Sequence, residues 1–192
     1  YMQIKDKNRV ASHGEVFTSP REVNAMLDLV KHETERIDSR FLEPACGTGN
    51  FLVEILGRKL NVVEMNYSQN QLDYEFYSII ALTSIYGVDI LEDNLKTCKD
   101  RLLGLFTEYY SNNYKSQIRE NYLKTAKFIL DRNIIWGDAL NLKTPDEKQK
   151  PIVFSEWNAV TNRMVKRRDY TLSNLLQAES VNSLPLFSDS GI

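Results

Sequence analysis

The sequence lacks the features that would place it among membrane, secreted or metal-binding proteins. Its 192 residues include only two cysteines, Cys46 and Cys98, which form no disulfide framework and have no metal-ligand spacing. No apolar run approaches the length of a membrane span, and the N-terminal stretch YMQIKDKNRV is too polar for a signal peptide. We therefore expect a cytoplasmic protein whose thiols stay reduced.

A large excess of charge is also missing. The 24 basic and 26 acidic residues give a formal net charge of −2, so the chain as a whole does not attract nucleic acid. Any contact with DNA would need a local basic patch. The hydrophobic share of 42% and the charged share of 26% are those of a globular protein, and the length suits one domain with or without a tail.

Helical and strand patterns alternate along the chain. The first helix has the start signals of a capping box in Ser19, Pro20 and Glu22, and its apolar pattern extends toward Ile37. From about Asn158 onward we expect no further strand. Alternation of this kind predicts an α/β fold with a parallel, doubly wound sheet. The other helices are predicted at about 51–60, 72–85, 91–110 and 117–130, and the strands at about 39–45, 85–90, 133–140 and 151–157.

Three of the predicted strands end in an acidic residue followed by a small or apolar one. The pairs are Glu43-Pro44, Asp89-Ile90 and Asp138-Ala139. Because the carboxyl ends of parallel strands line one edge of the sheet, where ligands bind, we expect these pairs to meet at a ligand site. Asp89 and Asp138 each have an alternative role, which is to cap the element that follows.

A glycine turn follows the first strand, in the stretch EPACGTGNF. Gly47 and Gly49 allow a tight turn and a close approach to a ligand, and Asn50 is placed to cap the next helix. The N-terminus of that helix favours an anionic group such as a carboxylate. The stretch is not a Walker loop, and Leu52 replaces the third glycine of the dinucleotide motif. A plain strand-to-helix turn is the alternative interpretation.

Two segments resemble motifs of DNA methyltransferases that act on an exocyclic amine. The stretch FLEPACGTGNFL resembles their S-adenosylmethionine-binding motif, in particular that of the adenine-N6 group and of the modification subunits of restriction systems. The stretch GEVFTSPREVNAML resembles their Phe-Thr-Pro segment, with Ser19 inserted between Thr18 and Pro20. The resemblance covers residues 14–142. It implies a Rossmann-like S-adenosylmethionine-dependent methyltransferase fold that is truncated or incomplete on its C-terminal side.

The same resemblance implies roles for individual residues in binding S-adenosylmethionine. Phe17 and Thr18 would flank the cofactor, and Glu43 with the backbone that follows would hold its amino-acid end. Asp89 would accept hydrogen bonds from the ribose hydroxyls and Asp138 from the adenine amino group, since carboxylates accept strongly from such donors. The implied cofactor site consists of Phe17, Thr18, Glu43, Pro44, Ala45, Cys46, Gly47, Gly49, Phe51, Asp89, Ile90, Asp138 and Ala139.

The motif with which these families bind the methyl-accepting amine is missing. It reads Asn/Asp-Pro-Pro-Tyr/Phe, and its aromatic ring stacks on the flipped base. The five prolines of this sequence follow Ser19, Glu43, Thr144, Lys150 and Leu184. The motif is therefore absent, and the stretch PIVFSEWNAV stands in its place, which makes Glu156, Trp157 and Asn158 the catalytic candidates. An aromatic role for Trp157 in the core or at an interface is the alternative.

Neither cysteine supports cytosine-C5 chemistry, which needs a nucleophilic thiol, usually after a proline. Cys46 follows Ala45. Cys98 follows Thr97 and lies on an apolar helix face, where a role in the core is expected. The sequence therefore offers no cysteine nucleophile for methyl transfer.

By composition the chain divides into three parts. We expect a loose N-terminal segment at 1–13, a methyltransferase-like cofactor-binding domain at 14–157 and a polar, basic tail at 158–192. The tail contains RMVKRRDY, a candidate nucleic-acid contact in which Tyr170 would stack on a base. A solvated helix face or a disordered basic segment is the alternative. The basic candidates are Arg163, Lys166, Arg167 and Arg168.

Two functions agree with these features. The first is an adenine-N6 DNA methyltransferase of the restriction–modification type, which binds S-adenosylmethionine and needs the rest of the chain or a partner subunit for catalysis. The second is a catalytically inactive cofactor-binding subunit with a regulatory or scaffold role. A methyltransferase for RNA or a small molecule is a third hypothesis. In the first two, DNA would be reached through a partner or through the basic patch.

Overall fold

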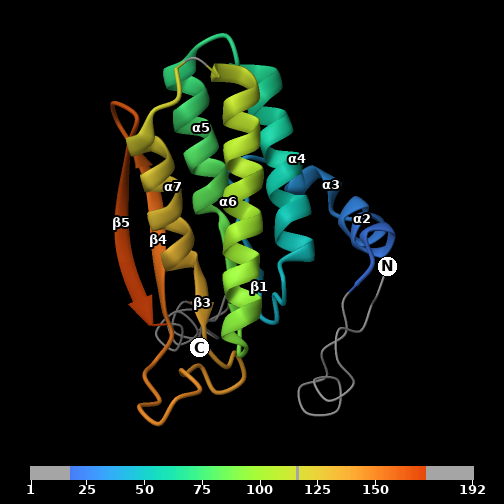
Figure 1. Cartoon of the computed structure of the whole chain (residues 1–192), viewed down its shortest axis with the longest axis vertical. Coiled ribbons are helices and arrows are strands. Elements are labelled where there is room, and N and C mark those ends of the chain that lie inside the picture. The colour runs from blue at the N-terminus through green and yellow to red at the C-terminus, as the bar shows by residue number, and fades with distance from the viewer. Residues whose placement is uncertain (1–17, 116, 172–192) are drawn as a thin grey trace, which may run out of the picture.

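A computed structural model describes residues 18–115 and 117–171, which form both helices and strands (Figure 1). None of the helices in these ranges is long and apolar enough to cross a membrane. The helices are α2 (Pro20–Asp28), α3 (Lys31–Thr34), α4 (Asn50–Tyr67), α5 (Gln71–Thr83), α6 (Glu92–Tyr114) and α7 (Glu120–Asn133). The strands are β1 (Phe41–Glu43), β2 (Ile85–Asp89), β3 (Ile134–Trp136), β4 (Val153–Val160) and β5 (Met164–Thr171).

The centre of the fold is a three-stranded parallel sheet in the order β1-β2-β3. Phe41 pairs with Ile85 on one side of β2, and Asp89 pairs with Trp136 on the other. All five residues of β2 are buried, as expected for the central strand of a parallel sheet. The α/β class and the parallel pairing of the first three predicted strands are therefore confirmed.

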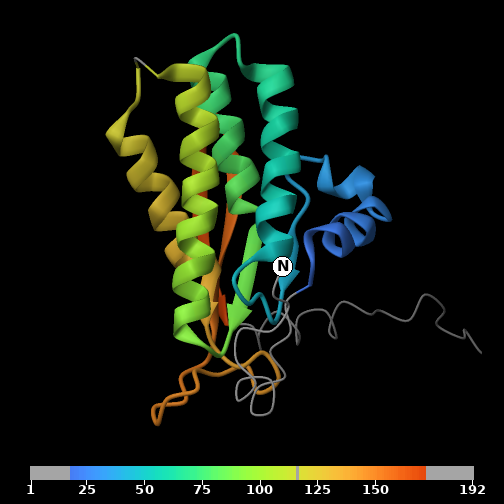
Figure 2. The ribbon, with the colours of Figure 1, turned by 45° about the vertical axis from the view of Figure 1, so that its right-hand side comes forward.

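The two faces of this sheet are covered differently. Helices α4 to α7 pack on one face around a large apolar core that includes Ile85 and Ile134 (Figures 1 and 2). Side chains alternate along a strand, so Tyr86 and Val88 point to the opposite face, where they pack against Ile152 and Phe154. Within the described ranges, the second face is thus covered by the β4 region and not by helices, in contrast to the doubly wound prediction.

The C-terminal strands correct the sequence prediction in two ways. The stretch predicted as a fourth parallel strand forms β4, which pairs antiparallel with β5 from Val153↔Thr171 to Val160↔Met164. No strand was predicted in β5, because most of its residues are polar and exposed and give no apolar alternation. The domain boundary predicted after Trp157 falls inside β4. The segments at 1–13 and 172–192 lie outside the described residues.

Helix α2 begins as predicted and ends earlier than predicted. The Ser19 hydroxyl accepts from the Glu22 backbone N–H at 3.4 Å, and the Glu22 carboxylate accepts from the Ser19 N–H at 3.0 Å, which completes the capping box. The helix stops at Asp28. Two hydrogen bonds of 3.2 Å tighten its last turn, from the Leu29 N–H to the Met26 carbonyl and from the Val30 N–H to the Leu27 carbonyl. Met26 is 54% exposed, so the apolar pattern did not mark a continuous buried stripe.

Candidate functional site

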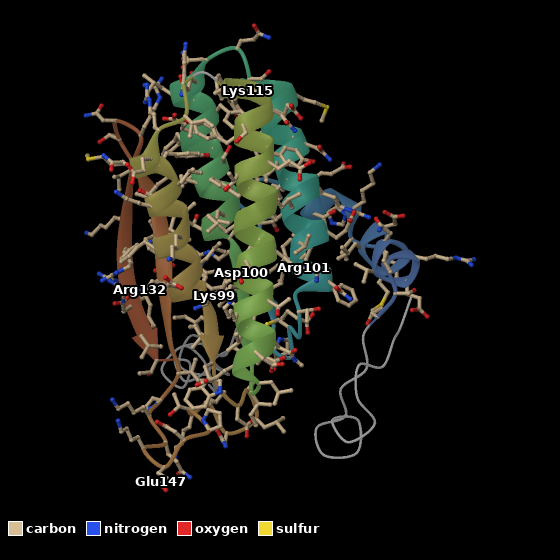
Figure 3. All side chains as sticks on the ribbon, viewed as in Figure 1. Lys99, Asp100, Arg101, Lys115, Arg132 and Glu147 are labelled. Atoms are coloured by element: carbon tan, nitrogen blue, oxygen red, sulfur yellow. The ribbon has the colours of Figure 1, made fainter. Side chains whose placement is uncertain are left out.

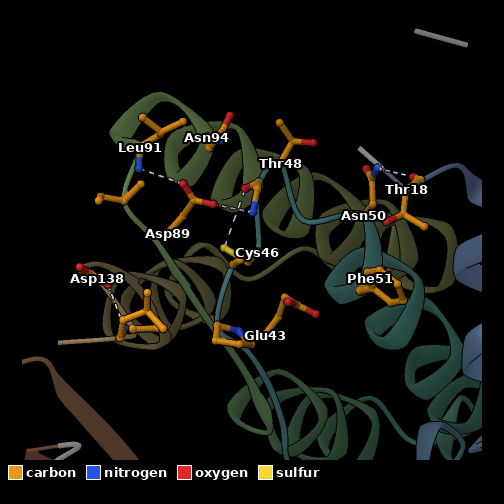
Figure 4. Close-up of a pocket in the computed structure, with 17 residues that line it drawn as sticks. Thr18, Glu43, Cys46, Thr48, Asn50, Phe51, Asp89, Leu91, Asn94 and Asp138 are labelled. Carbon is orange, nitrogen blue, oxygen red and sulfur yellow. Dashed lines mark hydrogen bonds between the residues drawn. The ribbon is translucent and has the colours of Figure 1, made fainter. Parts of the chain in front are cut away.

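A cavity of about 640 Å³ opens at the carboxyl edge of the parallel sheet (Figure 4). The ends of β1 and β2 and the segment after β3 contribute to it, as predicted from the three acidic strand ends. The lining residues are Thr18, Glu43, Pro44, Ala45, Cys46, Gly47, Thr48, Asn50, Phe51, Asp89, Ile90, Leu91, Asn94, Gly137, Asp138, Ala139 and Leu140. The structure therefore brings together most of the predicted site. Phe17 lies outside the described residues, and Gly49 does not line the cavity.

The glycine turn adopts a backbone that glycine favours at two positions. Gly47 has φ of 51° and Gly49 has φ of 83°, both in the left-handed region. A Cβ atom on Gly49 would lie 2.6 Å from Cys98 Sγ, so space is limiting as well. Gly49 is the N-cap of α4, which corrects the prediction that Asn50 fills this position. Asn50 is instead the first residue of the helix, and its side chain is free to make longer-range bonds.

Asp89 ties the end of β2 to the glycine turn. Its carboxylate accepts from the Gly47 N–H and from the Leu91 N–H, both at 2.8 Å, and the residue is 8% exposed. Leu91 is the N-cap residue of α6, and this helix has no side-chain cap, so Asp89 fixes the segment before α6 without capping the helix. A carboxylate has about four lone-pair sites, so these two bonds do not use its full capacity to accept, and the residue lines the cavity.

Asp138 plays a similar local role after β3. Its two oxygens accept from the Leu140 N–H and from the Asn141 side-chain amide, each at 2.8 Å. The Gly137 N–H donates to the Asp89 carbonyl at 3.0 Å and continues the pairing between β2 and this segment. These bonds hold the loop after β3 along the wall of the cavity.

Glu43 is a partly buried acidic residue of the cavity. Burial raises the pKa of the Glu43 carboxyl group above its ordinary value, and a hydrogen bond from the Ala45 backbone opposes the shift. Burial disfavours the carboxylate because the surroundings have a lower dielectric constant than water. For the same reason, the ionised carboxylate would attract a cationic ligand group more strongly than in water.

Cys46 lines the cavity and is buried, as is Cys98. The hydrogen bond with Cys98 and then burial raise the pKa of the Cys46 thiol. Because the thiolate is the nucleophilic form, this environment gives Cys46 no nucleophilic character, in agreement with the sequence analysis.

Further residues of the cavity were missed by sequence reasoning. Most are neighbours of predicted residues, and Thr48, Asn50 and Asn94 are the polar ones. A less obvious contributor is Arg101 on α6, whose Nη1 donates to the Thr48 carbonyl at 2.6 Å and to Asn50 Oδ1 at 2.8 Å. Arg101 gave no signal in the sequence because it is separated from the turn by some fifty residues and only the tertiary fold joins them.

The three catalytic candidates lie on β4 and do not line the cavity. The Trp157 indole N–H donates to Asn133 Oδ1 at 2.9 Å, and its ring packs edge-on against Phe128 with centroids 6.2 Å apart. Glu156 pairs with Arg40 at 3.1 Å, and Asn158 is exposed. The geometry agrees with the alternative role of Trp157 in packing.

The four basic candidates do not form one patch on a helix. Arg163 pairs with Asp73 at 2.7 Å. The other three lie on β5, where side chains alternate, so Lys166 and Arg168 point to one face and Arg167 to the other. Arg168 donates to the Tyr170 hydroxyl at 3.0 Å.

A comparison with known families supports a methyltransferase family of the restriction–modification class, and the parallel sheet fits such a fold. Residues 18–150 match the family described as MmeI, DNA-methyltransferase domain. Since the match covers more than half of the chain, the protein belongs to this family. No curated protein and no solved structure gives a significant match.

Proposed function

We propose that the chain binds S-adenosylmethionine in the cavity at the carboxyl edge and takes part in adenine-N6 methylation of DNA. The observation that carries this proposal is the meeting of the glycine turn with Glu43, Asp89 and Asp138 around one cavity. Membership of a DNA-methyltransferase family supports the reaction class.

The chemistry of the cavity agrees with the groups of this cofactor. Its amino-acid end carries an ammonium group, for which Glu43 is an acceptor, and its ribose carries two hydroxyl donors, for which Asp89 is suited. The adenine amino group is a donor toward Asp138, and the apolar side chains of Ile90 and Leu140 offer contacts for the ring. When bound, the cofactor supplies the electrophilic methyl group.

Recognition of the methyl acceptor is the part of the reaction that the cavity does not supply. Among the described residues no proline follows Asn or Asp, and no strand pairs with the outer edge of β1. In doubly wound sheets the ligand crevice lies where the strand order reverses, and the next strand is added at that edge. We therefore propose that a further strand, from the rest of the protein or from a restriction–modification partner, completes a Rossmann-like sheet and brings the DNA base to the site.

A second candidate function is a cofactor-binding subunit without catalytic activity. Two observations favour this candidate. The motif that binds the methyl-accepting amine is absent, and Glu156 forms an ion pair with Arg40 while the Trp157 indole donates to Asn133. Both candidates share the cofactor, and they differ in whether methyl groups reach DNA.

Two measurements test these proposals in order. Calorimetric titration with S-adenosylmethionine should show binding that Glu43→Gln weakens and that Asp73→Asn, a change remote from the cavity, leaves unaltered. Absence of binding at high micromolar ligand would refute both candidates. Transfer of a labelled methyl group to mixed-sequence DNA, with and without neighbouring restriction–modification subunits, then separates them, and N6-methyladenine in the product would identify the acceptor.

A further inference from the structure

Arg101 connects helix α6 to the first turn of α4. The residue lies on the side of α6 that is turned toward α4 (Figure 3). Its Nη1 donates to the Thr48 carbonyl at 2.6 Å, to Asn50 Oδ1 at 2.8 Å and to the Thr48 hydroxyl at 3.3 Å. Both acceptor residues line the cavity, whereas Arg101 does not. It therefore acts on the cavity through the residues that it holds.

Asn50 extends this contact to the N-terminal side of the chain. Because its amide oxygen accepts from Arg101, its amide nitrogen is turned toward Thr18, and it donates to the Thr18 carbonyl at 3.0 Å (Figure 4). The Arg101–Asn50–Thr18 chain of hydrogen bonds thus joins α6, the start of α4 and the segment that enters α2. It fixes three residues of the cavity rim, Thr18, Thr48 and Asn50, relative to one another.

The charge of Arg101 is available to the cavity. The three acceptors that it reaches are neutral oxygen atoms, and within the described ranges no carboxylate forms an ion pair with it. A guanidinium group stays protonated at every physiological pH. Arg101 is partly buried beside the N-terminus of α4, whose backbone dipoles also favour an anion. The positive charge of Arg101 and the helix dipole of α4 therefore favour an anion on the same side of the cavity.

We propose that Arg101 is a positioning residue for the carboxylate group at the amino-acid end of the ligand. This inference rests on the proposed function, because it assumes S-adenosylmethionine in the cavity. The Arg101 side of the cavity is positive and carries Thr18, Thr48 and Asn50, while Glu43 supplies a negative charge for the ammonium group. A zwitterionic amino-acid end matches this separation of charge.

Two ligands test the proposal, namely S-adenosylmethionine and 5′-methylthioadenosine, which has the same adenosine part and no amino-acid part. Arg101→Met should lower the affinity for S-adenosylmethionine about tenfold, which is the size expected when a favourable charge at a helix N-terminus is lost. It should change the affinity for 5′-methylthioadenosine by less than about threefold. Arg101→Lys keeps the positive charge but lacks the planar guanidinium group, so it should recover part of the lost affinity.

The control is Lys99→Met, which removes a positive charge from the same helix where it pairs with Asp131 at 3.1 Å (Figure 3). It should leave both affinities unchanged. Equal weakening of both ligands by Arg101→Met would mean that Arg101 only supports the fold, and unchanged binding of S-adenosylmethionine would likewise overturn the proposal. If the unaltered chain binds neither ligand, the proposed function fails together with it. Thermal unfolding of each variant shows whether the fold is retained.

Discussion

Replacement of Gly49 by alanine is expected to destabilise the glycine turn for two separable reasons. At φ of 83° an alanine adopts a left-handed backbone, which costs about 1–2 kcal/mol. Its Cβ would also lie 2.6 Å from Cys98 Sγ, and overpacking of a buried site costs a further ~1–3 kcal/mol. We therefore expect Gly49→Ala to lower the free energy of unfolding by about 2–5 kcal/mol, measured by urea denaturation.

A double-mutant cycle separates the two contributions. Cys98→Ala removes the sulfur atom that the new Cβ would meet, so in this background Gly49→Ala should retain only the backbone part of its destabilising effect. The coupling energy between the two sites should accordingly be about 1–3 kcal/mol. Gly104→Ala is the matched control, because Gly104 is exposed in the middle of α6 and its Cβ meets nothing within 4 Å. That change should stabilise the protein by about 0.5–1 kcal/mol.

Two results would refute this reasoning. One is a Gly49→Ala variant as stable as the unaltered protein, which would mean that the turn does not need its left-handed backbone. The other is a coupling energy near zero, which would mean that Cys98 does not limit the space beneath the turn. In either case the packing of α6 against the glycine turn would need another explanation.

Three further changes probe charge and packing. Three oxygens, those of Ile37, Ser39 and Ser84, accept from the buried Lys59 ammonium, yet burial lowers the pKa of Lys59 to about 7. The unfolded chain then holds more protons above pH 7, so from pH 7 to 9 the unfolding free energy should rise relative to Lys59→Met, by at most about 1.4 kcal/mol per pH unit in denaturation curves. Because burial raises the pKa of Glu43 above 4.5, S-adenosylmethionine affinity in calorimetry should fall with acidification before ordinary carboxyl groups titrate, and Glu43→Gln should abolish that pH dependence. Trp157→Ala should lower the free energy of unfolding by about 2–3 kcal/mol and leave cofactor affinity unchanged. A loss of methyl transfer without a loss of stability would instead indicate that Trp157 takes part in catalysis.

The parts of the site that follow from local sequence were predictable. Gly47 and Gly49 mark backbone that other residues adopt at a cost, and the acidic ends of β1 and β2 mark the carboxyl edge of a parallel sheet. Arg101 was not predictable, because its contact with Thr48 depends on how α6 packs against α4. Neighbouring residues of the cavity, such as Asn94, became visible only once α6 was placed.

The errors in the fold have separate physical causes. Strand β5 is largely polar and exposed and is held by its backbone pairing with β4, so side-chain periodicity does not reveal it. Asn50 looked like a helix cap because asparagine is a strong N-cap residue, but the left-handed turn at Gly49 moves the cap back by one position. The side chain of Asn50 is thereby released to bind Thr18 and Arg101.

Three charged side chains hold the walls of the cavity by hydrogen bonds to neighbouring segments. Asp89 holds the glycine turn, Asp138 holds the loop after β3, and Arg101 holds the start of α4. A site formed in this way does not have to be ordered when the ligand binds, so less of the interaction energy is lost to entropy. Under the proposed function, the cavity holds the cofactor, and methyl transfer depends on the further strand that we propose beside β1. Cofactor binding and methyl transfer should therefore be separable by experiment. The affinity for S-adenosylmethionine should be the same with and without the structure that supplies the further strand.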